Sequence, residues 1–260
     1  MKKALLTVSF GTSHLDTLEK NIAAIERDLA AALPDRTPRR AFTSGMIMKK
    51  LRQRDGIVIP NVDEVLAQLA EEGFEDVLIQ PTHVINGEEY DKLCAQARPY
   101  EERFVRLRLG TPLLTDAEDY RALAQAVLPT LPEKRGDTSV VFMGHGSEHH
   151  ANAVYAMLDY LFRDLGREDI HIGTVEGYPG LDEVRRRIND RGGVSRVLLL
   201  PLMIVAGDHA KNDLAGDEDD SWKSIFQKAG YDVQCVLSGL GENPAVREIF
   251  AHHARRAAEA

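Results

Sequence analysis

A histidine between two glycines, at the end of an apolar run, is the residue best placed for chemistry in this sequence. Residues 140–143 form the run, and Gly144 and Gly146 flank His145. In an open α/β sheet, ligands bind just beyond the carboxyl ends of the parallel strands. The glycines let the backbone turn sharply and let a bulky ligand come close. His145 is therefore interpreted as a metal ligand or a general base, with a loop histidine bonded to a backbone carbonyl as the alternative.

Two more side chains follow predicted strands in the same part of the chain. Glu176 comes after a short strand predicted over 170–175, and His209 follows the strand that ends at Pro201. Two imidazoles and one carboxylate suit a divalent first-row metal and leave coordination positions open. The sequence therefore predicts His145, Glu176 and His209 as metal ligands at three strand ends.

The elements that must position these residues occur twice along the chain. The apolar run over 77–81 is echoed by 197–201, and the helix start at 62–65 is echoed by 181–184. Strands alternate with helices in both copies, which predicts a parallel sheet flanked by helices on both faces. The predicted fold class is α/β with two similar halves and a cleft between the carboxyl ends of their strands.

The boundary between the halves is predicted at a linker-like stretch, 129–137, which is rich in Pro, Gly and charge. The N-terminal half is expected to span residues 1–132 and the C-terminal half residues 133–260. The C-terminal half carries the metal-site histidines, and its last helix is free to pack back on the first half.

The repeat also pairs residues between the halves. Glu89 has the place of His209, each eight residues beyond the proline that ends a strand, and Phe10 has the place of His145. The second copy thus supplies imidazoles and the first supplies a carboxylate. We predict His145, His209 and Glu89 as catalytic residues that converge on one cleft.

Composition excludes several classes of protein. With 43% hydrophobic and 28% charged residues, the chain is typical of a soluble globular protein. A net charge of −9 argues against a nucleic-acid partner. No apolar run approaches the roughly 20 residues of a membrane helix, and the apolar N-terminus is too short for a signal peptide. Cys94 and Cys235 lack metal-ligand spacing, so we expect a cytoplasmic protein with two incidental thiols.

Several stretches resemble the anaerobic cobalt chelatases of the CbiK type, in the class II chelatase family. They are residues 86–90, 175–179, 209–217 running on to Ser221 and Trp222, and 143–147 followed by His149, Ala151, Asn152 and Tyr155. The resemblance spans essentially the whole chain and implies a ferrochelatase-like fold with a tetrapyrrole between two α/β halves. It implies a lyase that inserts Co²⁺ into sirohydrochlorin on the oxygen-independent cobalamin route, with no organic cofactor. The family's metal-site histidines fall on His145 and His209, and its acidic partners fall on Glu176 and Glu89.

The chemistry of insertion explains the need for several basic groups. The macrocycle must lose two pyrrole protons, and metal binding competes with proton acceptance for the same lone pair. Sirohydrochlorin also carries eight carboxylates, which hydroxyls and backbone N–H groups at helix starts can bind. Basic residues at Lys49, Lys50 and Arg52 are weaker candidates, better interpreted as a solvated helix face. The predicted substrate contacts, apolar and polar together, are Phe10, Thr12, Ser13, Val84, Ser147 and Met203.

The sequence leaves three alternatives open. The same ligands bind iron or nickel, for sirohaem or F430, because affinity order does not select cobalt. A non-catalytic carrier of tetrapyrrole or metal would use a similar two-part protein, and a metal-dependent hydrolase would need a water-activating base but no flat apolar cleft. A homo-oligomer and an additional bound haem are also compatible with the sequence.

Overall fold

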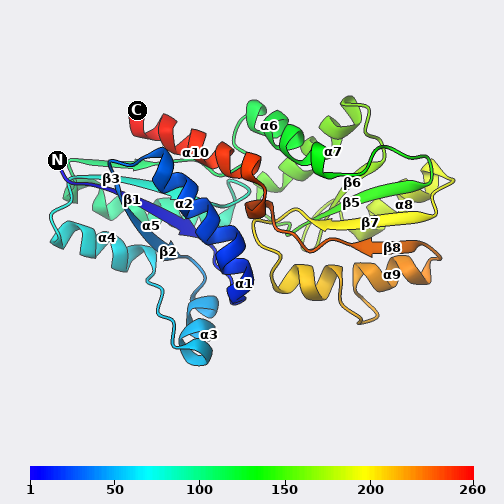
Figure 1. Ribbon diagram of the computed structural model, residues 1–260, viewed down its shortest axis with the longest axis horizontal. Helices are drawn as coiled ribbons and strands as arrows, with labels where there is room; N and C mark the ends of the chain where they lie inside the picture. The colour runs from blue at the N-terminus through cyan, green and yellow to red at the C-terminus, as the bar shows by residue number, and fades with distance from the viewer. The chain divides into compact units, whose positions relative to one another are not determined.

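The computed structural model describes residues 1–260 and divides into two units (Figure 1). Unit 1 contains Met1–Thr115 together with Pro244–Ala260, and unit 2 contains Asp116–Asn243. These limits differ from the predicted ones because helix α6 (Ala117–Val127) packs with unit 2 and helix α10 (Pro244–Glu259) packs with unit 1. None of the helices combines the length and apolar character that crossing a membrane requires.

Unit 1 is built on a four-stranded parallel sheet in the order β2-β1-β3-β4. Its central strands are apolar runs buried on both faces, as expected when helices cover both sides of a parallel sheet. The strands are β1 (Lys3–Ser9), β2 (Thr37–Phe42), β3 (Asp76–Pro81) and β4 (Arg106–Leu109).

Helices cover both faces of this sheet (Figure 1). Helices α2 and α10 pack together on one face, and α4 and α5 enclose the core of the other, with Leu66 and Leu93 fully buried. Helix α3 begins at its cap, Ser44, and extends away from the sheet. The remaining elements of unit 1 are α1 (Leu15–Thr17), η1 (Leu18–Ile22), α2 (Ala23–Ala32), α3 (Gly45–Asp55), α4 (Val62–Glu71), α5 (Glu88–Ala97) and η2 (Arg98–Arg103).

The first helical region is less regular than its sequence indicates. Apolar residues at helical spacing over 15–29 predict a single α-helix, but residues 18–22 form a π-helical segment, η1. A π turn accommodates one extra residue per turn and is common near functional sites. The hydrophobic stripe does not reveal it, because the buried face stays continuous through the irregular turn.

Unit 2 repeats the architecture with a parallel sheet in the order β6-β5-β7-β8. Helices α8 and α9 enclose a core that contains Val184, Trp222 and Phe226, and α7 packs on the opposite face. The strands are β5 (Thr138–Gly144), β6 (Ile170–Thr174), β7 (Arg196–Pro201) and β8 (Asp232–Cys235). The helical elements are α6, η3 (Leu128–Thr130), η4 (His150–Asn152), α7 (Ala153–Asp164), α8 (Leu181–Arg191), η5 (Ala210–Leu214), α9 (Trp222–Lys228) and η6 (Leu240–Glu242).

The two sheets have equivalent registers. Val8 pairs with Pro81 in unit 1, and Met143 pairs with Pro201 in unit 2. Two residues further along the chain, just beyond β1 and β5, stand Phe10 and His145, as the repeat predicts. The predicted fold class, two similar halves with helix-flanked parallel sheets, is thus confirmed.

Candidate metal site

His145 is the first residue beyond β5, and its ring is held by the backbone. The Nδ1 atom lies 2.9 Å from the carbonyl oxygen of Gly146. A carbonyl oxygen only accepts, so Nδ1 carries the hydrogen and Nε2 keeps its lone pair. Gly146 has a φ of +85°, and a Cβ there would lie 2.8 Å from the backbone nitrogen of Gly177. The glycine is therefore required both by the backbone conformation and by the close approach of the next loop.

Glu176 is held beside His145 because the pairing of β5 with β6 continues beyond the strands. The backbone N–H of Val175 donates to the carbonyl of Gly144 at 3.1 Å, and that of Glu176 donates to the carbonyl of His145 at 2.8 Å. The Oε2 atom of Glu176 lies 3.8 Å from Nδ1 of His145. The carboxylate and the imidazole therefore leave neighbouring strand ends side by side.

His209 reaches the same place from the loop after β7, immediately before η5. Its Nδ1 atom lies 2.6 Å from Oδ2 of Asp213. A carboxylate only accepts, so Nδ1 donates and the lone pair of Nε2 is again available. Asp213 follows four residues later in the π-helical segment, which brings it back against the ring.

The structure brings these three predicted ligands together within unit 2. One ligand atom from each of His145, Glu176 and His209 lies within 4.8 Å of the others. The two imidazole rings are perpendicular, with centroids 4.7 Å apart. Ligand atoms about 2.1 Å from a shared ion lie about 3.4 Å apart in a tetrahedral site, so the three side chains would have to draw together to coordinate one ion.

The three side chains are also accessible, with 47%, 58% and 39% of their surfaces exposed for His145, Glu176 and His209 respectively. A thiolate-free site with two imidazoles and one carboxylate exchanges its ion more readily than a closed Cys₄ site. The arrangement is therefore suited to a metal that must be taken up and given away.

A second layer of residues joins the loops that carry the ligands. The Asn152 Oδ1 atom accepts from the backbone N–H of Ser147 at 3.0 Å, and its Nδ2 donates to the carbonyl of Tyr178 at 2.6 Å. Tyr155 packs against Gly144, where a Cβ would lie 2.4 Å from its ring. Burial raises the pKa of Tyr155 to about 12, although backbone hydrogen bonds at Gly146 and His145 oppose the shift.

Glu89 and His83 lie in unit 1, at the carboxyl edge of its sheet. Burial alone would raise the pKa of Glu89, but a hydrogen bond from Lys92 and nearby positive charge bring the pKa below its ordinary value. Burial lowers the pKa of His83 to about 4, against the opposing charge of Glu89. At neutral pH, Glu89 is therefore ionised and His83 is neutral.

Three predicted substrate contacts lie where β1 ends. Phe10 is 46% exposed, whereas Thr12 and Ser13 are buried. The Thr12 hydroxyl is hydrogen bonded to the hydroxyl of Thr17 at 2.9 Å and accepts from the backbone N–H of His14 at 3.2 Å. Neither hydroxyl residue is the N-cap of the following helix, because His14 occupies that position and makes no capping hydrogen bond with its side chain.

The other three predicted contacts are divided between the units. In unit 1, Val84 is half-buried, and its carbonyl accepts from the backbone N–H of Leu114 at 3.0 Å. In unit 2, Ser147 follows the metal-site loop, and its hydroxyl accepts from the N–H of His149 at 3.0 Å. Met203 packs against the core of unit 2.

Sequence reasoning assigned no role at the site to Asp213 and Asn152, which appear only among the residues that carry the family resemblance. Asp213 carries a usable signal, because an acidic residue four positions after a candidate histidine can return to the ring within one helical turn. Asn152 carries no sequence signal of comparable strength, since its two hydrogen-bond partners, Ser147 and Tyr178, lie 5 and 26 residues away along the chain.

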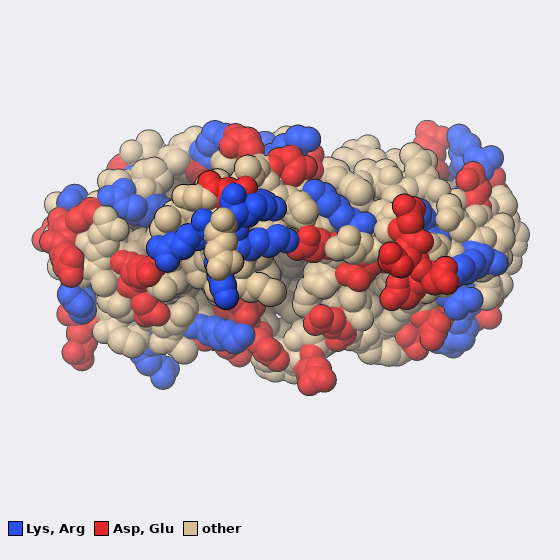
Figure 2. Space-filling model, turned by 90° about the horizontal axis from the view of Figure 1, so that it is seen from below, with Lys and Arg blue, Asp and Glu red and all other residues tan.

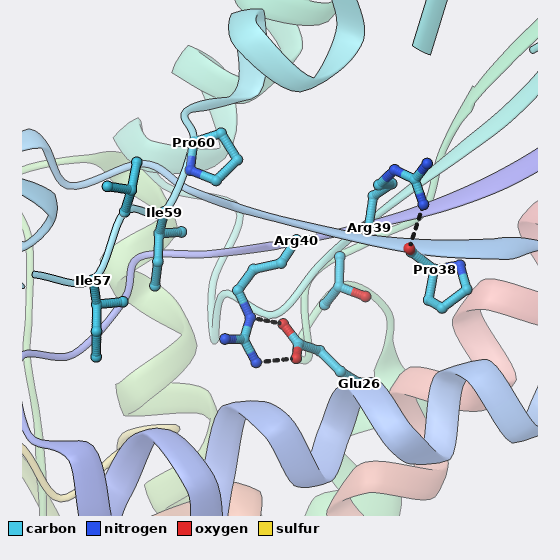
Figure 3. A pocket seen from close by; sticks show the side chains of 9 residues that line it. Glu26, Pro38, Arg39, Arg40, Ile57, Ile59 and Pro60 are labelled. Atoms are coloured by element: carbon cyan, nitrogen blue, oxygen red, sulfur yellow. Dashed lines mark hydrogen bonds and ion pairs between the residues drawn. The ribbon is translucent and has the colours of Figure 1, made fainter. Parts of the chain in front are cut away.

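A pocket of about 420 Å³ lies elsewhere in unit 1, beside the edge strand β2 (Figure 3). Its main polar groups are already paired, because Arg40 makes a two-pronged ion pair with Glu26 and Arg39 donates to the carbonyl of Pro38. No predicted site residue lines it. The geometry of the ligands, and not the presence of a cavity, therefore identifies the candidate site.

Solved structures with this fold include SirB from Bacillus subtilis with Fe³⁺. That structure has a TM-score of 0.67 and 17% identity, and covers 99% of this chain and 96% of its own. SirB in complex with cobalt, from Bacillus subtilis subspecies spizizenii, has a TM-score of 0.63 and 14% identity, with 100% and 96% covered. The chain therefore shares its fold with SirB.

The sequence comparisons are more specific. Residues 3–259 match the family described as cobalt chelatase (CbiK). A sirohydrochlorin cobaltochelatase of Salmonella typhimurium strain LT2 is 52% identical over 257 residues, covering 99% of this chain and 97% of that protein. The sirohydrochlorin cobaltochelatase CbiKC of Nitratidesulfovibrio vulgaris strain Hildenborough is 34% identical, with 100% and 92% covered. The chain belongs to the CbiK cobalt chelatase family.

Proposed function

We propose that this protein inserts Co²⁺ into sirohydrochlorin in the oxygen-independent cobalamin pathway. The observation that carries the proposal is the group of His145, Glu176 and His209, whose ligand atoms lie within 4.8 Å of one another. Membership of the cobalt chelatase family supports cobalt as the substrate metal and sirohydrochlorin as its acceptor.

The metal step uses the two available Nε2 lone pairs and the Glu176 carboxylate. Both imidazoles direct Nδ1 to an acceptor, at Gly146 for His145 and at Asp213 for His209, so neither needs to change tautomer before it binds a cation. Imidazole and carboxylate ligands suit cobalt, and the open coordination positions accept the macrocycle nitrogens. The proposed order is uptake of Co²⁺ by these three residues, followed by transfer to the ring.

The proton step needs acceptors other than an imidazole that is occupied by metal. Each histidine can accept a proton once its lone pair has released the ion. Glu89 is the proposed additional acceptor in unit 1. Its carboxylate is ionised at neutral pH, and its lowered pKa means that an accepted proton passes readily to water.

The basic helix α3 supports an anionic substrate. The protein carries a net charge of −9, and a ligand with eight carboxylates is repelled by such a molecule unless local charge reverses the field. Exposed basic side chains gather over α3 of unit 1 (Figure 2). They include Lys49 and Arg52, both of which are exposed. We propose that α3 attracts the carboxylates of the macrocycle.

The deciding experiment offers metal-free sirohydrochlorin to the full-length protein with Co²⁺, Fe²⁺ or Ni²⁺ separately. The macrocycle absorbance is followed under anaerobic conditions. The expected result is many insertions per chain with Co²⁺, and faster insertion than with the other two ions. Uptake of one equivalent without release would instead indicate a carrier, and preference for iron or nickel would reassign the metal.

A further inference from the structure

The hydrogen bond between His209 and Asp213 distinguishes the two histidines of the site. His145 directs Nδ1 to the neutral carbonyl of Gly146 at 2.9 Å, whereas His209 directs it to a carboxylate at 2.6 Å. A charge-assisted hydrogen bond is shorter and roughly twice as strong as a neutral one. The ring of His209 is therefore held by a stronger contact that adds negative charge to the imidazole.

The imidazole of His209 is the single partner of the Asp213 side chain. Its side chain is 44% exposed and makes neither a salt bridge to Lys or Arg nor a helix cap. A solvated aspartate that pairs only with a histidine contributes little to folding. Its contact is directed instead at one of the three side chains that form the metal group.

We infer that Asp213 is a positioning residue that sets the affinity of the site for Co²⁺ through His209. The inference rests on the proposed function only in the identity of the ion. The carboxylate fixes the tautomer with hydrogen on Nδ1, holds the orientation of the ring, and makes the imidazole a stronger donor to the metal. In other metal sites, loss of such a partner reduces metal affinity by about 10–100-fold.

The test measures Co²⁺ binding to the full-length protein at fixed pH and without macrocycle, by calorimetry and by the visible d–d bands of bound Co²⁺. Asp213→Ala should weaken affinity by about 10-fold or more. Asp213→Asn should lie between this variant and the unaltered protein, because an amide oxygen still accepts from Nδ1 but carries no charge. Asp217→Asn is the matched control. It removes the same charge four residues away, from a side chain that pairs with Lys223 and not with a ligand.

Three results would overturn the inference. These are affinity of Asp213→Ala within twofold of the unaltered protein, an equal loss in Asp217→Asn, and no Co²⁺ binding by the unaltered protein. An unchanged d–d spectrum in Asp213→Ala, with weakened binding, would also contradict a positional role. Insertion assays on the same samples separate this inference from the proposed function. If insertion is normal and Asp213→Ala leaves Co²⁺ affinity unchanged, only the inference is contradicted. If Asp213→Ala loses affinity but the unaltered protein never inserts metal, only the proposed function is contradicted.

Discussion

Units 1 and 2 share a sheet but differ in the side chains at its carboxyl edge. In each unit, two backbone N–H groups beyond the edge strand donate to the end of the central strand. Thr43 and Ser44 donate to Ser9 and Phe10, whereas Val175 and Glu176 donate to Gly144 and His145. The same hydrogen bonds therefore place Phe10 and Ser44 in one unit, and His145 and Glu176 in the other.

The loops that follow β3 in unit 1 and β7 in unit 2 also have equivalent backbone hydrogen bonds. The carbonyl of His83 accepts from Leu113, and the carbonyl of Met203 accepts from Leu240. Glu89 and His209 then follow six residues after these equivalent positions. The backbone thus offers equivalent loops twice, and side-chain choice alone makes a metal group in unit 2 and a carboxylate with a buried histidine in unit 1.

The largest difference between the units is expected when His145 of unit 2 and its equivalent in unit 1, Phe10, are each replaced by Ala. His145→Ala should abolish insertion, because it removes a ligand from the metal group. Its free energy of unfolding should change by less than about 0.5 kcal/mol, since the side chain is exposed. Phe10→Ala should keep turnover and raise the KM for the macrocycle. Insertion assays and urea unfolding of both variants measure the contrast. Full turnover by a folded His145→Ala protein would show that His145 has no part in the mechanism.

The second pair, Glu89 and His209, separates proton handling from metal binding. Glu89→Gln should slow insertion by about 10²-fold, a typical contribution of a positioned proton acceptor, with a smaller effect on Co²⁺ affinity. His209→Gln should lose affinity and insertion together. Single-turnover insertion and calorimetric titration with Co²⁺ supply the two quantities. Equal losses of both in Glu89→Gln would identify it as a ligand instead.

Each unit also buries one histidine that is neutral at pH 7. Burial lowers the pKa of His83 and of His171 to about 4, and nearby arginines add to the effect at His171. The unfolded chain binds more protons between pH 6.5 and pH 4, so stability falls as the pH falls through this window. The loss reaches at most about 3 kcal/mol for each histidine.

Urea unfolding between pH 7 and pH 4 measures this loss. His171→Leu should flatten the pH dependence of unit 2, because β6 buries the ring with neither nitrogen hydrogen bonded. His83→Leu should act similarly on unit 1. His252→Gln, at an exposed position on α10, is the control for loss of an imidazole. A pH slope that is unchanged in both leucine variants would show that neither burial costs stability.

Much of this contrast could be predicted from the sequence, because period and repeat are local signals. Apolar runs ending at Pro81 and Pro201 locate equivalent strands, and the strand-end rule places His145, Glu176 and His209 at one edge. The return of α10 to unit 1 could not be predicted as firmly, since its apolar face would suit either sheet. The four-residue spacing is compatible with the contact of Asp213 with His209, but the π-helical form of η5 depends on backbone hydrogen bonds that residue spacing does not encode.

Helix α3 is the element that unit 2 lacks, and its charge gives the smallest expected effect. In unit 1 the chain leaves β2 through Ser44 into α3, whereas in unit 2 it passes from Glu176 to α8 by a short loop. Replacing Lys49 and Arg52 together by Gln should raise the KM for sirohydrochlorin by about threefold at low ionic strength, because exposed charges attract an anion over about 10 Å. The kcat should remain unchanged.

The matched control replaces Arg98 and Arg106 by Gln, which removes the same charge from the amino edge of the sheet in unit 1. Both doubly substituted proteins change the net charge equally, so an effect of total charge would raise both KM values alike. An effect of α3 would raise only the KM of the protein substituted at Lys49 and Arg52. This difference should disappear in about 1 M salt, where the screening length falls to about 3 Å. A threefold difference that persists in high salt would indicate direct contact of α3 with the macrocycle instead of long-range attraction.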